Sequence, residues 1–178
     1  MMKKHLTGLL ALFLALPFAA SAGTAKTLHV EEKVEIKAPA ADVWAKVSNF
    51  GDLGAWHPAV AKTEITGGTN NKKGAVRVLT LGDGGKITEK LTAYDAKKMT
   101  FTYVITEGVL PVSSYKSTLT VKAGKGGMTT VVWSGSFKRK DTSDKPKEGQ
   151  DDKTAVDTMK NVYRAGLDNL KKISEGGK

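Results

Sequence analysis

The feature that most constrains the fold of this chain is a series of short strand-like runs followed by one long amphipathic segment. The runs are rich in Val, Ile, Thr and Tyr, and glycine-rich turn signals such as TGGTNNKKG, LGDGGK and KAGKGGM separate them. They cover residues 60–66, 75–81, 86–94, 99–106, 113–122 and 128–138. Because short turns connect neighbouring runs, the pattern predicts strands joined by antiparallel hairpins.

Two further segments complete the predicted architecture. Apolar and polar side chains alternate over residues 28–37, which predicts a first strand. The pattern of residues 40–58 predicts two short helices. After the polar loop 141–150, apolar residues recur at helical spacing from Val156 to Ile173. We therefore predict an α+β fold, with a seven-stranded curved antiparallel sheet around a long C-terminal helix and two short helices after the first strand. A sheet that wraps one helix encloses more volume than the helix fills, so a cavity is expected between them.

Strand periodicity also predicts which polar side chains face the interior. Arg77 and Glu89 each lie among apolar residues two positions away, so both share the inner face if the turn at residues 83–85 has an odd length. They are then directly or diagonally opposed. A buried ion pair needs compensation, which makes a structural pair one interpretation. The alternative is that the pair borders a pocket and hydrogen-bonds the polar end of a ligand.

The same periodicity places several more polar and aromatic side chains on the inner surface. Glu32 lies among apolar residues of the first strand, and His57 lies between a tryptophan and a proline in GDLGAWHPAV. The candidate ligand-binding residues are Trp56, His57, Arg77, Glu89, Tyr103, Tyr115, Trp133 and Tyr163.

His57 has three possible roles: a ring that holds the backbone of a loop, a contact at the mouth of a pocket, or a general acid-base group. After residue 22 the chain has one other histidine, His29, which is expected to point outward, and the chain has no cysteine. No catalytic signature surrounds His57. We therefore assign no catalytic residue, no metal ligand and no cofactor.

The first 22 residues have the composition of a secretory signal peptide. A short basic start precedes the apolar run 6–19, and Ala20-Ser21-Ala22 offers small residues for cleavage. We predict a signal peptide over residues 1–22, one domain over residues 23–178, a periplasmic location and no stable membrane insertion after cleavage. The remaining 156 residues carry 26 basic and 18 acidic side chains. An exported protein rarely meets nucleic acid, so the dispersed basic side chains indicate mainly a solvated face and, secondarily, a field that attracts an acidic partner protein or an anionic ligand.

Several longer segments carry a resemblance to a known family. They are APAADVWAKVSNFGDLGAWHPAV, GAVRVLTLGDGGKITEKLTAYD, FTYVITEGVLPVSSYKSTLTV, VVWSGSF and VYRAGLDNLKKI, and together they extend from about Thr27 to Ile173. The chain resembles the polyketide cyclase/dehydrase and lipid-transport type of the START/Bet v 1-like (SRPBCC) superfamily. This resemblance implies a helix-grip fold, with a cavity between a seven-stranded sheet and the terminal helix.

The signal peptide and the domain together resemble the small periplasmic accessory proteins of bacterial methanol oxidation, the MxaD type. That resemblance implies a non-enzymatic accessory role, in which the chain assists the interaction of methanol dehydrogenase with its cytochrome. A carrier of a small hydrophobic or lipid-like ligand is the first alternative. An enzyme of the cyclase/dehydrase kind is the second, because this fold hosts many functions.

Overall fold

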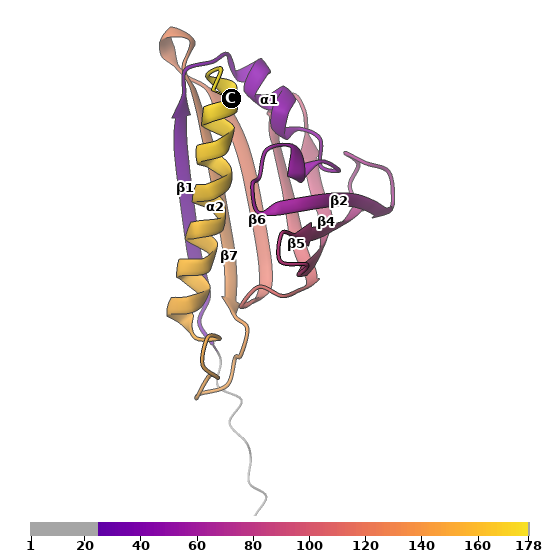
Figure 1. The fold of residues 1–178 in the computed structure, drawn as a ribbon, viewed down its shortest axis with the longest axis vertical. Helices are drawn as coiled ribbons and strands as arrows, with labels where there is room; N and C mark the ends of the chain where they lie inside the picture. The colour runs from indigo at the N-terminus through magenta and orange to yellow at the C-terminus, as the bar shows by residue number, and fades with distance from the viewer. Residues whose placement is uncertain (1–24, 178) are drawn as a thin grey trace, which may run out of the picture.

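The fold consists of one antiparallel sheet and one long helix that lies along one side of it (Figure 1). The structure is a computed structural model that describes residues 25–177, so the predicted signal peptide lies outside the described residues. In chain order the elements are β1 (Leu28–Ile36), α1 (Ala40–Val47), the 3₁₀ turn η1 (Leu53–Ala55), β2 (Val60–Gly67), β3 (Val76–Leu81), β4 (Lys86–Asp95), β5 (Thr100–Gly108), β6 (Val112–Ala123), the 3₁₀ turn η2 (Lys125–Gly127), β7 (Thr129–Arg139) and α2 (Asp152–Ser174).

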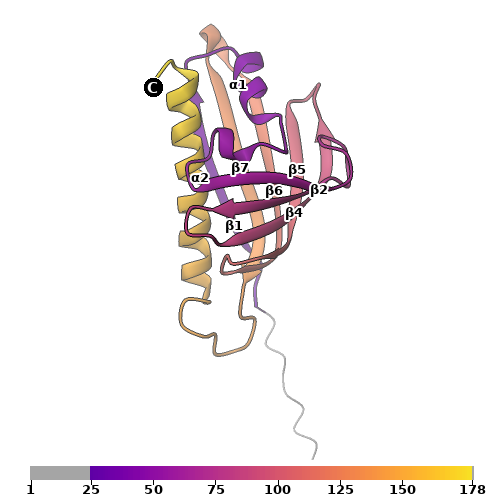
Figure 2. The ribbon, with the colours of Figure 1, turned by 45° about the vertical axis from the view of Figure 1, so that its right-hand side comes forward.

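The seven strands form a single sheet in the order β1-β7-β6-β5-β4-β3-β2. From β2 to β7 each strand pairs with the next one along the chain, as the turn signals predicted. The first strand pairs instead with the last, and Leu28 lies opposite Phe137. The sheet curves strongly, so that β2, β3 and β4 run across the direction of β1 and β7 (Figure 2). The prediction of a curved seven-stranded antiparallel sheet is confirmed.

Helix α2 begins at a side-chain cap and packs against β1 and β7. The carboxylate of Asp151 accepts a hydrogen bond from the backbone N–H of Thr154 at 2.9 Å, which satisfies one of the free donors of the first turn. The face toward the sheet buries Met159, Tyr163 and Leu167. Within residues 25–177 no helix is both long and apolar enough to cross a membrane.

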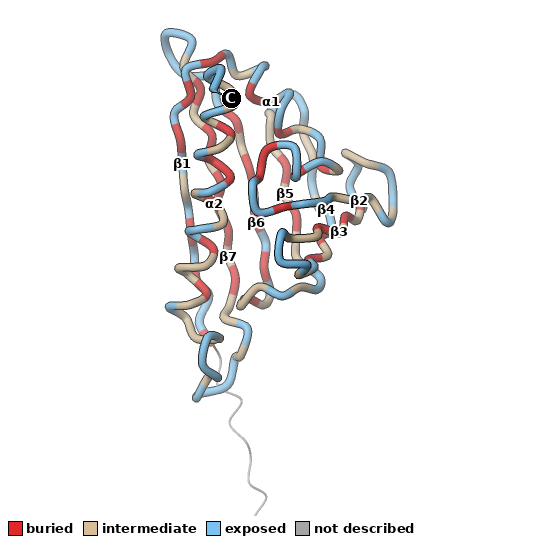
Figure 3. The backbone as a smooth tube through the Cα atoms, viewed as in Figure 1, coloured by how far each residue is buried: buried red, intermediate tan, exposed pale blue. Residues whose placement is uncertain are grey.

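Buried residues gather between the helix and the inner surface of the sheet (Figure 3). Along β7 buried and partly buried residues alternate over nine positions, as expected for a strand with one face toward the core. Each large apolar side chain buried in this layer contributes about 1.5–3 kcal/mol to stability. The packed layer therefore holds the curved sheet against the helix in a protein that has no disulfide.

The β3–β4 hairpin has the odd-length turn that the inner-face assignment requires. Leu81 N–H donates to the carbonyl of Gly85 at 2.8 Å, which leaves residues 82–84 as a three-residue loop. Gly84 has φ +87°, a left-handed conformation that glycine adopts without strain. Arg77 and Glu89 are consequently direct partners in the register.

The region after β1 differs from the prediction of two short helices. Helix α1 is present, but the second helix is reduced to the 3₁₀ turn η1. Gly51 and Gly54 disfavour a helix here, and Pro58 supplies no N–H to continue one. The short turn places Trp56 and His57 at the start of a loop that leads into β2.

Strand β6 contains a bulge near its start that the sequence pattern did not predict. Its register with β7 shifts between Ser113 and Lys116, and Ser114 has φ +49°. The extra residue changes the alternation, so that Val112 and Tyr115 are both buried although they are three positions apart.

Candidate ligand cavity

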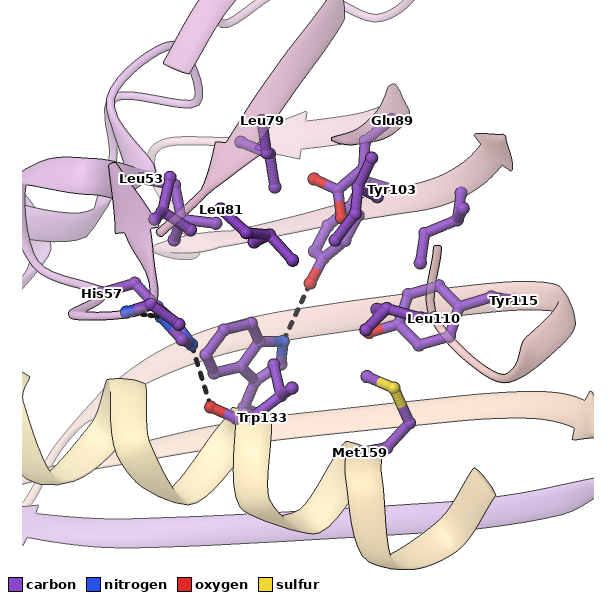
Figure 4. A pocket seen from close by; sticks show the side chains of 15 residues that line it. Leu53, His57, Leu79, Leu81, Glu89, Tyr103, Leu110, Tyr115, Trp133 and Met159 are labelled. Carbon is purple, nitrogen blue, oxygen red and sulfur yellow. Dashed lines mark hydrogen bonds between the residues drawn. The ribbon is translucent and has the colours of Figure 1, made fainter. Parts of the chain in front are cut away.

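A cavity of about 80 Å³ lies between the inner face of the sheet, helix α2 and the loop that follows η1 (Figure 4). Apolar side chains form most of its wall, and few polar groups reach it. The lining residues are Leu53, His57, Ala59, Val60, Leu79, Leu81, Ile87, Glu89, Tyr103, Ile105, Leu110, Tyr115, Trp133, Met159 and Val162. A concave, mainly apolar site with a few convergent polar groups is the usual form of a small-molecule site.

The structure divides the eight candidate residues into two groups. Those that line the cavity are His57, Glu89, Tyr103, Tyr115 and Trp133. The other three, Trp56, Arg77 and Tyr163, are buried behind this lining. Trp56 packs on the ring of Trp133 at a centroid distance of 5.4 Å, and Tyr163 stacks on Trp133 at 4.6 Å. These two residues support the Trp133 ring rather than face the cavity.

His57 is 2% exposed and makes a hydrogen bond through each ring nitrogen. Nδ1 accepts from the backbone N–H of Ala59 at 3.2 Å, and Nε2 lies 2.9 Å from the carbonyl oxygen of Val162. Because a carbonyl oxygen only accepts, Nε2 carries the proton and the neutral ring satisfies both contacts. His57 therefore holds the loop to α2, and one side of its ring lines the cavity.

Burial lowers the pKa of His57, and the positive charge of Arg77 adds to this effect, whereas the hydrogen bond to Val162 opposes it. The neutral ring is accordingly favoured at neutral pH.

Two more features bring the loop close to the helix. The Asn169 side chain donates to the backbone oxygen of Trp56 at 2.9 Å. Gly166 lies where α2 faces the rings: a Cβ atom there would be 2.7 Å from Cδ2 of His57 and 2.9 Å from Cζ3 of Trp133. Glycine at this position thus permits the close approach of helix, loop and sheet.

Arg77 and Glu89 form a buried ion pair at one wall of the cavity. Nε and Nη2 of Arg77 are both 2.6 Å from Oε2 of Glu89, and the two residues are 2% and 4% exposed. Nη1 of Arg77 donates to the backbone oxygen of Phe50 at 2.7 Å, and the guanidinium carbon lies 4.0 Å from the centre of the Phe50 ring. Arg77 is not among the residues that line the cavity, whereas its partner Glu89 is.

Two opposing effects act on the pKa of the Glu89 carboxyl group. Burial raises the pKa of the Glu89 carboxyl, and the charge and hydrogen bonds of Arg77 oppose that rise.

A chain of hydroxyl groups and one indole N–H lies under the rest of the cavity. Trp133 Nε1 donates to Tyr103 Oη at 3.1 Å and to Ser117 Oγ at 3.0 Å. Ser117 Oγ also donates to Ser134 O at 2.8 Å and lies 3.0 Å from Tyr163 Oη, which is 2.6 Å from Tyr115 Oη. Burial raises the pKa of Tyr103 to about 12, and it also raises the pKa values of Tyr115 and Tyr163. These phenols remain neutral hydrogen-bonding groups.

Glu32 lies on the inner face of β1, as the first-strand pattern predicted, but it does not line the cavity. It is half-buried and forms an ion pair with Arg164 of α2.

Several lining residues were missed by the sequence analysis. Met159 and Val162 belong to the apolar face of α2, where nothing distinguishes a residue under a cavity from one in a filled core. Leu110 lies in the β5–β6 loop, and the apolar sequence GVLPV within a surface loop was the available signal. Across residues 25–177 no group of three or more His, Cys, Asp or Glu side chains is arranged to hold a metal ion.

The chain matches one protein family over most of its length. The family described as "Polyketide cyclase / dehydrase and lipid transport" matches residues 27–175. No functionally curated protein was found to match the chain in sequence.

Solved structures of relatives cover nearly the whole domain. The XoxI protein from Bacillus cereus has a TM-score of 0.71 at 28% identity, covering 82% of this chain and 94% of that chain. A protein from Nitrosospira multiformis has a TM-score of 0.70 at 26% identity, covering 84% and 97%. The likeness to the XoxI protein supports the resemblance to the MxaD type.

A more distant neighbour shows the fold alone. The crystal structure of Ara h 8.0201 has a TM-score of 0.64 at 20% identity and covers 84% of this chain and 98% of that chain.

Because the family match extends over residues 27–175, the chain belongs to the polyketide cyclase/dehydrase and lipid transport family of the SRPBCC type, with the Bet v 1 helix-grip fold.

Proposed function

We propose that this protein is a non-enzymatic accessory protein that binds a small, mostly apolar ligand in the cavity beside α2. The observation that carries the proposal is an apolar cavity whose few polar side chains are already held in hydrogen bonds. Such groups orient a ligand and exclude water, which is what a binding site requires.

The same contacts argue against proton transfer as the main role of the cavity. Both ring nitrogens of His57 are engaged with backbone groups, and one carboxylate oxygen of Glu89 is held by Arg77. A general base must exchange its proton with a substrate while it keeps its position. For His57 this would break the contact that holds the loop to α2.

The size of the cavity limits the ligand. Pockets for drug-sized ligands enclose about 300–1,000 Å³, whereas this cavity has about 80 Å³. A single ring or a short alkyl chain fits this scale, and a complete lipid does not. Met159, which has a flexible side chain, lies in the wall and allows modest adjustment.

Native mass spectrometry of protein purified from its own host tests ligand binding. We expect a bound species of low mass that is released on denaturation. A protein that is always recovered empty, and that takes up none of a panel of small apolar compounds, would contradict the proposal.

For the cellular role we propose a periplasmic location and assistance to methanol oxidation, at the interaction of methanol dehydrogenase with its cytochrome. Support comes from the likeness to the XoxI protein, from the composition of residues 1–22, and from the excess of basic side chains. An acidic partner would be attracted by this charge, and its association rate would fall as salt is added.

The second experiment adds residues 23–178 to purified methanol dehydrogenase and its cytochrome. We expect faster electron transfer at low salt and a loss of the effect at about 1 M salt, where charges are screened within about 3 Å. An equally basic unrelated protein is the control. No binding and no change in rate at low salt would refute this role without affecting the ligand-binding proposal.

A further inference from the structure

One carboxylate oxygen of Glu89 is left open to the cavity. Arg77 contacts Oε2 through two nitrogens, and Oε1 has no hydrogen-bond partner among the described residues. In residues 25–177 two side-chain atoms are both fully enclosed and without a hydrogen-bond partner, namely Asn70 Oδ1 and Ser174 Oγ. Glu89 Oε1 also lacks a partner but is not one of these two atoms. It is therefore not fully enclosed and borders open space. Glu89 lines the cavity (Figure 4), so we infer that the open space next to this oxygen belongs to the cavity.

We propose that the cavity selects neutral hydroxyl compounds, small alcohols or phenols whose O–H donates to Glu89 Oε1 while the hydrocarbon part fills the apolar space. This inference rests on the proposed ligand-binding function and adds the class of ligand to it. A buried acceptor that lacks a donor is costly, so a ligand that supplies the donor gains more than its apolar contacts alone would give.

The ion pair itself excludes charged ligands of either sign. Arg77 and Glu89 together carry no net charge and are almost completely buried. An ammonium group next to them would leave one positive charge uncompensated in a region with little water, and a carboxylate would also be repelled by Glu89. A neutral donor adds a hydrogen bond without adding a charge.

The phenol of Tyr103 favours a ligand group that can accept a hydrogen bond as well as donate one. Its Oη accepts a hydrogen bond from Trp133, and the hydroxyls of Tyr115 and Ser117 lie close enough to lower its pKa by hydrogen bonding. Tyr103 lines the same cavity as Glu89, and its phenol stays protonated because burial raises its pKa to about 12. A hydroxyl is both donor and acceptor, so it can donate to Glu89 while it competes with the Tyr115 and Ser117 hydroxyls for the proton of Tyr103.

The test uses four probes that share one six-membered ring: cyclohexanol, methylcyclohexane, cyclohexylammonium and cyclohexanecarboxylate. Each is titrated into residues 23–178, and binding is followed by the NMR shifts of cavity methyl groups. We expect cyclohexanol to bind at least about tenfold more tightly than either ion, in line with the energy of hydrogen bonds to charged groups. An ion that binds as tightly as cyclohexanol would overturn the inference.

A double variant, Arg77→Met with Glu89→Leu, separates the hydroxyl preference from general apolar binding. It removes both charges together, which avoids an unpaired buried ion. The affinity for cyclohexanol relative to methylcyclohexane should fall about tenfold or more in this variant. An unchanged ratio in a folded double variant would overturn the inference, and if the variant does not fold, the ranking of the probes on the parent protein decides.

The outcomes also separate this inference from the proposal beneath it. If no probe binds the parent protein, ligand binding itself is refuted. If methylcyclohexane binds and neither the probe ranking nor the double variant shows a hydroxyl preference, the cavity is a binding site and the inferred ligand class is wrong.

Discussion

The Nε2 atom of His57 lies 2.9 Å from the carbonyl oxygen of Val162, a residue of helix α2 that is 105 positions further along the chain. This contact closes one side of the cavity, since both residues line it. The other ring nitrogen accepts from Ala59 N–H, so a second proton on the ring would face a donor.

Stability should therefore fall in mild acid. The pKa of His57 is lowered by burial, so the folded protein binds this proton less readily than the unfolded chain does. The contribution of His57 is fully present above its ordinary value of 6.5 and is lost as pH falls toward the folded-state pKa. Urea unfolding from about pH 8 to about pH 5 should show the decrease.

The two histidines of the described chain offer a matched control for this prediction. His57→Gln keeps an N–H donor but does not titrate, so the decrease between these pH values should become shallower. His29 is exposed on β1, and His29→Gln should leave the decrease unchanged. Equal slopes for the two variants would show that His57 is not the titrating group.

Gly166→Ala should destabilise the protein although alanine is the better helix former by about 1 kcal/mol. The new methyl group would meet His57 and Trp133 at less than 3.0 Å. Overpacking of this kind costs about 1–3 kcal/mol, which outweighs the gain in helix propensity.

Urea denaturation of the Gly166→Ala variant measures this change. The control is Asn161→Ala, at an exposed position of the same helix, which should be neutral or slightly stabilising. A Gly166→Ala protein as stable as the parent would mean that the helix can move away from the loop at little cost.

Glu89→Gln alone should be far more harmful than the combined change Arg77→Met and Glu89→Leu. The single change leaves the buried Arg77 without its counter-ion, at a cost of about 3–5 kcal/mol. The combined change replaces the pair by apolar groups, so the double variant should be the more stable of the two by about 2 kcal/mol or more. Free energies of unfolding for the parent, Glu89→Gln and the double variant provide the comparison, and a double variant no more stable than Glu89→Gln would contradict the prediction.

The tyrosines should resist ionisation while the protein is folded. Burial raises the pKa of Tyr103 to about 12 and raises the pKa values of Tyr115 and Tyr163, and Tyr94 is shifted upward as well. At about pH 11 a free tyrosine is mostly ionised, yet ultraviolet absorbance should show less than half of the phenolate signal of the four tyrosines.

Adding denaturant at the same pH should release the full signal. The control is Tyr94→Phe, which should remove most of the phenolate signal that the folded protein does show. A folded protein that ionises three or four tyrosines at this pH would contradict the buried hydroxyl chain.

Local pattern predicted much of this architecture because its determinants are close together in sequence. The seven strands follow from period-two alternation and turn signals. The odd-length loop predicted that Arg77 and Glu89 share the inner face as direct or diagonal partners, and the register shows the direct pairing. The long helix was equally visible, because its apolar face recurs over six turns.

The sequence pattern did not predict how deeply each side chain is buried or which residues far apart in the chain come into contact. Periodicity tells which face a residue occupies but not how far it lies from the cavity, so Trp56, Arg77 and Tyr163 were grouped with residues that line it. The β6 bulge depends on one left-handed residue, Ser114, and the turn signal EGVLPVSS that ends at this residue predicted the loop before the strand but not a bulge within it. The contact of His57 with Val162 exists only once helix, loop and sheet are assembled.

The pairing of the first strand with the last has a consequence for folding kinetics. In the register, Leu28 lies opposite Phe137 and Ile36 opposite Thr129, so β1 lacks its neighbouring strand until nearly the whole chain has been synthesised. Contacts between residues so far apart must overcome a large loop-closure entropy, and folds rich in them form slowly. We therefore expect the hairpins from β2 to β7 to form first, and β1 and α2 to dock in the final, rate-limiting step.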